Sequence, residues 1–177
     1  MAGKRQAIAT AAVMVLGSLA WVGGIWIAGL EGVRGFFGPG PLIADANLIL
    51  EFILVAGVSY GFLLARRGNI DAHQLNQTTW VVLNLGLIAL VMAGSMQDVK
   101  LAKTADLADW RIGVTWLHAA AGTLTAAAGL WIVLQMNGVL PASLHVAAWR
   151  RLMRATLAGY WLTGLLGFLT YYFWYVA

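Results

Sequence analysis

The sequence predicts an all-α integral membrane protein, a bundle of about five transmembrane helices forming a single domain over residues 1–177. Of these residues 61% are hydrophobic and 10% are charged, and the mean hydropathy is +0.79. Several apolar stretches reach the roughly 20 residues that a helix needs to cross a hydrocarbon core of about 30 Å. Backbone groups inside lipid must pair within their own segment, so we expect these stretches to be helices.

The first span, 7–30, follows Lys4 and Arg5 as the apolar region of a signal peptide would. It is longer than such a region and four more spans follow it, so we expect a retained helix. The connection after it contains Gly38-Pro39-Gly40-Pro41, which cannot continue a helix. The remaining spans are expected at 46–65, 78–97, 112–136 and 155–177.

The charged residues predict the orientation of these spans. If the N-terminus is cytoplasmic, seven basic residues share its side with a single acid, Asp71, whereas acids outnumber bases on the other side. The positive-inside rule therefore favours an N-terminus inside and a C-terminus outside, in a multi-pass protein of a bacterial or archaeal plasma membrane. The basic residues cluster at helix ends and not on one groove-binding face, so nucleic acid is not an expected partner; lipid and other membrane subunits are.

Residue types that are missing exclude several kinds of chemistry. The chain has no cysteine, which excludes disulfides, iron–sulfur clusters and covalently attached c-type haem. It also lacks HExxH and GxSxG motifs, so hydrolytic catalysis is poorly supported, and an enzyme is less favoured than a binding or accessory protein.

Two ionisable side chains lie inside the predicted spans, and they are the first candidates for a functional site. His118 begins a stripe of small residues, with Gly122, Thr125 and Gly129 on the same helix face, so it is expected to face protein. Glu51 lies at a similar depth near the outer end of its helix. The pair, with Asn47 one turn away from Glu51, is suited either to moving protons or to binding a metal. The alternatives are that Glu51 snorkels to water and that His118 only forms a structural hydrogen bond.

The other two histidines lie near the opposite side of the membrane. If the third helix begins early, capped by Asp71, His73 shares a face with Gln77 and Asn84. Asn84 is a polar candidate, although interhelical hydrogen bonding is its commoner role. A backward extension of the last helix would bring His145 onto the face of its small-residue seam, which comprises Thr156, Gly159, Thr163, Gly167 and Thr170. His73, His118 and His145 are therefore candidate cofactor ligands, with solvated histidine the alternative for the first and last.

Several of these features resemble the bacterial and archaeal membrane protein family called domain of unknown function 420, over about residues 40–175. The features are Asp45-Ala46-Asn47-Leu48, the pair Arg66 and Arg67 followed by His73, His118 at the start of the fourth span, His145 before an arginine cluster, and Thr163-Gly164. Some members are implicated in maturing haem–copper oxidases. The resemblance implies a haem- or copper-related assembly role in which His73, His118 and His145 contact the cofactor.

Three functions remain open on the sequence alone. The first is an assembly or accessory factor of a respiratory membrane complex that holds haem or copper transiently. The second is a b-type cytochrome subunit in quinol-linked electron transfer, which needs two histidines at one depth. The third is a structural subunit without chemistry, docked through its small-residue seams. The cofactor is left unknown, with haem b or copper as the possibilities.

Overall fold

A computed structural model describes residues 2–92 and 109–177. Five of its helical segments are long and apolar enough to cross a membrane, so the predicted all-α architecture with five candidate membrane spans is confirmed. Across the described residues the chain contains no strand, apart from an isolated bridge between Arg34 and Pro41. The helices are α1 (Ala2–Ile27), α2 (Leu42–Arg66), α3 (Ile70–Leu87) with its π-helical continuation η1 (Ile88–Met92), α5 (Trp110–Met136) and α6 (Trp149–Tyr175), and a short 3₁₀ turn, η3 (Ala142–Leu144), precedes α6.

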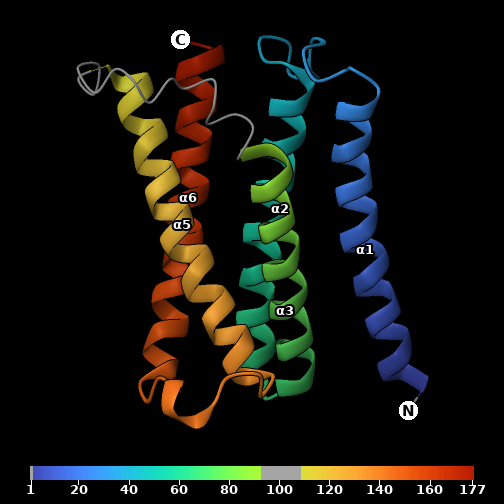
Figure 1. The fold of residues 1–177 in the computed structure, drawn as a ribbon, viewed down its shortest axis with the longest axis vertical. Helices are drawn as coiled ribbons and strands as arrows, with labels where there is room; N and C mark the ends of the chain where they lie inside the picture. Colours follow the sequence, from blue (N-terminus) through green and yellow to red (C-terminus); the bar gives the residue numbers. More distant parts are fainter. Residues whose placement is uncertain (1, 93–108) are drawn as a thin grey trace.

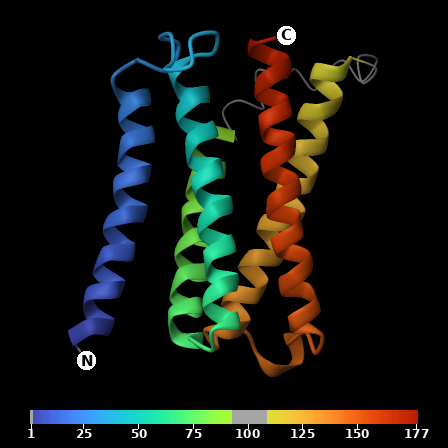
Figure 2. The same cartoon turned by 180° about the vertical axis from the view of Figure 1, so that it is seen from behind.

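Four of these helices form a bundle and the fifth lies beside it. α2 packs against α3, α5 against α6, and the two pairs join through α2 with α6 and α3 with α5. α1 contacts α2 and α3 at the edge of the molecule, as Figure 1 and the reverse view in Figure 2 show. The chain ends at the end of the bundle opposite to where it begins (Figure 1).

The helix ends differ from the predicted spans for local reasons. α1 stops at Ile27 because the chain turns at Gly29, whose φ of 65° suits glycine. α3 does begin early, at Ile70, but its cap is Asn69 and not Asp71: the Asn69 side chain accepts a hydrogen bond from Ala72 N. The predicted residues 93–97 of the third span lie outside the described residues.

Small residues lie where the helices approach most closely. Between α2 and α3, a Cβ on Gly57 would overlap the Trp80 ring. Asn76 forms hydrogen bonds with both residues: its side chain donates to Gly57 O at 2.9 Å and accepts from Trp80 Nε1 at 3.1 Å. On α6, a Cβ on Gly159 would overlap Thr125, and one on Gly167 would overlap the Glu51 carboxyl group. The prediction that the α6 seam packs against protein is confirmed.

The outward surface of the helices is apolar. Val13, Ile27 and Leu124 are 71%, 91% and 73% exposed, and many other large hydrophobic side chains are also exposed. Such a surface would be unfavourable in water but is compatible with contact to lipid chains.

Candidate functional site

Arginine side chains collect at one end of the bundle, called here the basic end. It is formed where α1 begins, α2 ends and α6 begins, and its arginines are Arg5, Arg66, Arg67, Arg150, Arg151 and Arg154. The sequence predicted this grouping from the alternation of the spans.

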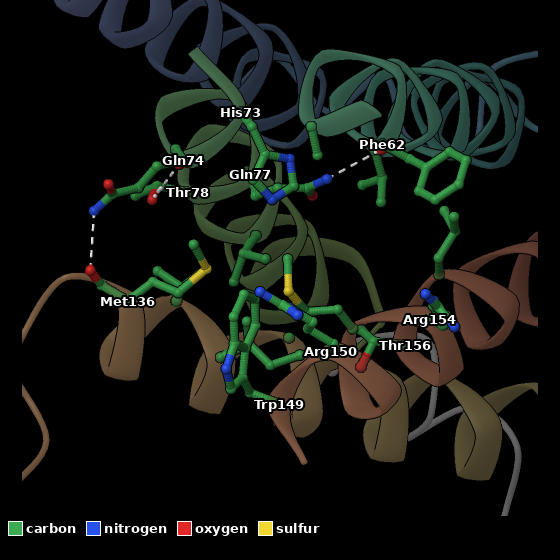
Figure 3. A pocket seen from close by; sticks show the side chains of 18 of the residues that line it. Phe62, His73, Gln74, Gln77, Thr78, Met136, Trp149, Arg150, Arg154 and Thr156 are labelled. Atoms are coloured by element: carbon green, nitrogen blue, oxygen red, sulfur yellow. Dashed lines mark hydrogen bonds between the residues drawn. The ribbon is translucent and has the colours of Figure 1, made fainter. Parts of the chain in front are cut away.

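A cavity of about 380 Å³ opens at the basic end between α2, α3, α5 and α6. Figure 3 shows it from close by, with His73, Gln74 and Gln77 of α3 on one wall and Trp149, Arg150 and Arg154 of α6 on another. Aliphatic and thioether side chains line much of the remainder, among them Val58, Val81, Ile132, Met136, Met153 and Leu157. Its volume lies within the range of about 300 to 1,000 Å³ typical of ligand pockets, and its walls are apolar with a few polar groups.

His73 is the buried histidine of this cavity, being only 4% exposed. Its Nδ1 donates a hydrogen bond of 2.7 Å to the carbonyl oxygen of Gly61; a carbonyl can only accept, so Nδ1 carries the proton. In the neutral imidazole, Nε2 is then the unprotonated nitrogen. It is buried and has no hydrogen-bond partner within residues 2–92 and 109–177. A neutral imidazole fixed through one nitrogen, with a free lone pair on the other, is the usual state of a histidine that binds a metal or haem iron.

Exposed arginines rim this cavity, and aromatic rings orient two of them. The guanidinium of Arg150 lies 5.1 Å from the Trp149 ring centroid, and that of Arg66 lies 5.9 Å from the Phe62 centroid. Arg154 also lines the cavity, whereas Arg67 and Arg151 do not. An apolar cavity with a cationic mouth suits a ligand with an apolar body and anionic groups.

A second, smaller cavity of about 30 Å³ lies between the same four helical segments, in the half of the bundle farther from the basic end. It is lined by the predicted polar residues Asn47, Glu51 and Asn84, together with Thr125, Tyr160 and Thr163. Glu51 is 8% exposed, so its side chain is buried in the bundle and does not snorkel to water.

The predicted neighbourhood of Glu51 and His118 is present in the structure. His118 Nδ1 lies 4.0 Å from Glu51 Oε1, too far for a hydrogen bond, and donates instead to the carbonyl oxygen of Thr163 at 3.1 Å. In the described part of the chain, no group of three His, Cys, Asp or Glu side chains is placed to hold a metal ion. Two ligand side chains are too few for a closed metal site, so this arrangement is better suited to protons and water than to a metal.

His145 lies apart from both cavities. α6 begins at Trp149, so the helical extension that would have turned His145 inward does not form. The cause is a contact with α5: the side-chain amide of Gln135 donates to Val146 O at 3.5 Å and accepts from Val146 N at 2.9 Å, which holds the segment outside the helix. His145 is exposed, and its Nε2 bonds to the Leu140 carbonyl.

Sequence reasoning missed two residues that shape these sites. Tyr160 is 4% exposed and lines both cavities, yet in the sequence it resembles any aromatic residue of a membrane helix. The sequence singled out Asp45 only within the Asp45-Ala46-Asn47-Leu48 motif, but Asp45 is fully buried and accepts hydrogen bonds from Phe37 N at 2.7 Å and Tyr171 Oη at 2.5 Å. No local signal indicates either position, because each depends on how α6 packs against α2.

No protein-family model, curated protein or solved structure matches this chain. The arguments about function therefore rest on the site and on the resemblance described in the sequence analysis.

Proposed function

We propose that this chain is a membrane-embedded accessory or maturation factor of a respiratory complex, and that it holds haem transiently in the cavity at the basic end. The observation that carries the proposal is the buried, unprotonated Nε2 of His73, which lines this cavity without a partner from the described residues. Leaving such an acceptor unpaired costs free energy, so a ligand that coordinates it would be stabilised there.

The walls of the cavity fit the rest of a haem. Apolar side chains suit the macrocycle, and Arg66, Arg150 and Arg154 suit its carboxylates at the mouth. In such a complex Nε2 of His73 would hold the haem iron, with the proton on Nδ1 held by the Gly61 carbonyl, and the haem would supply redox chemistry. The resemblance to oxidase maturation proteins supports the same class of ligand.

The number of histidines favours transient binding over electron transfer. A b-type cytochrome needs two histidines on facing helices, but His73 is the one histidine that lines this cavity within the described residues. His118 lies against Glu51 in the other half of the bundle, and His145 is exposed in a loop. A haem that a single histidine would hold would be easier to pass on, as a maturation factor requires.

Copper is a second candidate for the same cavity. The thioethers of Met136 and Met153 line it together with His73. Thioether and imidazole ligands suit Cu(I), so a copper-handling role would use the same end of the protein.

We further propose that the basic end faces the cytoplasm of a bacterial or archaeal cell, with the N-terminus inside and the C-terminus outside. The grouping of arginines at this end supports that orientation through the positive-inside rule.

Titration of the purified protein with haem, followed by absorption spectroscopy and metal analysis, tests the proposal. The wild type and His145→Ala should bind haem with the spectrum of a histidine-ligated iron, and His73→Ala should lose that spectrum. His145 is the matched control because it is exposed and lies outside the cavity. Equal spectra for His73→Ala and His145→Ala, or no haem binding by the wild type, would overturn the haem assignment; Cu(I) binding that depends on His73, Met136 and Met153 would replace haem by copper.

A further inference from the structure

The smaller cavity contains buried polar atoms that the protein does not satisfy by itself. Asn47 Oδ1, Glu51 Oε1 and Thr163 Oγ1 are buried, line this cavity and find no hydrogen-bond partner among residues 2–92 and 109–177. Buried polar groups in native proteins are nearly always paired with protein or with ordered water. Tyr160, which also lines this cavity, adds a fourth such oxygen atom, its hydroxyl Oη. A cavity lined by four unpaired oxygen atoms is therefore expected to contain water.

The cavity is large enough for that water. Its volume is about 30 Å³, and a water molecule needs at least roughly 10 to 15 Å³ by such a measure, so about two molecules fit. With two to four polar partners each, they would link the Glu51 carboxyl group to the Asn47 amide and the Thr163 hydroxyl.

Glu51 has few groups around it that could balance a negative charge. Each of the four surrounding helices places a polar group near Glu51: α5 brings His118, which does not itself line the cavity, within 4.0 Å of the carboxyl group, α6 brings Tyr160, α3 brings the uncharged Asn84, and α2 itself brings Asn47. No arginine or lysine lines this cavity in the described part of the chain. A carboxylate removed from water without a cationic partner is costly, so binding a proton is the available way to remain there.

Tyr160 separates this cavity from the one at the basic end, and it lines both. A Cβ added to Gly129 of α5 would lie 3.0 Å from the Tyr160 hydroxyl, so this hydroxyl lies at the contact between α5 and α6. A hydroxyl group can accept a proton on one lone pair while donating its own, which makes it suitable for passing protons between two hydrated spaces.

We propose that Glu51 is a buried proton-binding site in a hydrated cavity, and that Tyr160 connects this cavity to the one at the basic end. When the Glu51 carboxylate takes a proton, the proton comes from a cavity water. That water regains one from the Tyr160 hydroxyl, and the hydroxyl takes one from water in the larger cavity. Solvent at the basic end then returns a proton to this last water. Tyr160 is unchanged at the end, and the net event is transfer of one proton from the basic end to Glu51. This proposal does not depend on which ligand the larger cavity holds.

Hydrogen–deuterium exchange at the Glu51 carboxyl group tests the proposal by infrared spectroscopy on protein in lipid nanodiscs. The carbonyl band of a protonated carboxyl group shifts in D2O, and the band that disappears in Glu51→Gln belongs to Glu51. Tyr160→Phe should slow the shift about tenfold or more, since the transferring hydroxyl is lost while the packed ring is kept. Tyr172→Phe is the matched control, an exposed tyrosine on the same helix that lines neither cavity, and it should exchange like the wild type.

A second variant covers the case in which Tyr160→Phe does not fold. Gly129→Ala leaves the hydroxyl in place but crowds it with a methyl group, and it should also slow exchange. Exchange at the wild-type rate in the folded variants would overturn the Tyr160 connection. A wild type with no Glu51 carboxyl band at any pH at which the protein stays folded would overturn the proton site.

Discussion

Tyr171 Oη donates a hydrogen bond of 2.5 Å to Asp45 Oδ1, joining residues 126 positions apart in the chain. Asp45 is completely buried, and its other carboxylate oxygen accepts from Phe37 N at 2.7 Å. This carboxylate therefore ties the loop before α2 to the last turns of α6, at the end of the bundle opposite the basic end.

Tyr171→Phe should destabilise the protein by about 1 to 3 kcal/mol, because a buried carboxylate loses one of its donors while the ring is kept. The free energy of unfolding in mixed micelles measures the effect. Tyr172→Phe, on an exposed neighbour, should change it little. Equal stabilities of the two variants would show that water replaces the Tyr171 hydroxyl without cost.

Gly167→Ala should also be destabilising, by about 1 to 3 kcal/mol, because its methyl group overlaps the buried Glu51 carboxyl group, which must then move within a packed interface. Gly17→Ala is the matched control: it is also in a helix, but nothing lies within 4 Å of the added Cβ, so it should be neutral or stabilising. Thermal unfolding of the two variants in the same detergent compares them directly. A Gly167→Ala protein as stable as Gly17→Ala would mean that Glu51 can move aside freely.

Much of the fold could be predicted from the sequence because lipid imposes simple rules. Helix number follows from apolar length, and the inward faces of α5 and α6 follow from small residues every three or four positions, as Gly129 and Gly159 illustrate. The contact between Glu51 and His118 was likewise predictable, since both are ionisable and lie at similar depth.

What could not be predicted depends on contacts between segments far apart in the chain. The larger cavity needs His73, Arg66 and Arg154 from three helices, and no pattern within one helix reveals that they share it. His145 was placed inward by extending a periodic seam, but hydrogen bonds between Gln135 and Val146 hold the segment in another conformation. Periodicity identifies a helix face but not where the helix begins.

The orientation of the bundle gives a prediction that the absence of cysteine makes simple to test. Single cysteines introduced as Ser143→Cys, near the basic end, and Gly32→Cys, in the loop at the opposite end, lie at exposed positions. An impermeant thiol reagent added to intact cells should label Gly32→Cys and should label Ser143→Cys only after the cells are broken, if the basic end is cytoplasmic. The reverse pattern would invert the orientation, and labelling of both in intact cells would contradict the five-helix crossing.

The last prediction compares two arginines at the basic end, one that lines the cavity and one that does not. Arg154 lines the cavity and Arg151, on the same helix, does not. Both are exposed, so each substitution removes the same charge from the same end of the protein at a similar cost to folding. If an anionic ligand such as haem lies in the cavity, Arg154→Gln should weaken its binding about three- to tenfold, as expected for one partly solvated ion pair. Arg151→Gln should alter binding less than that, since a charge farther from the ligand acts through water and salt.

Dissociation constants measured at two salt concentrations distinguish the two contributions, because the difference between the variants should shrink as salt is added. Equal weakening by both substitutions would mean that the basic end attracts the ligand only through its total charge, and that the rim arginines do not contact it.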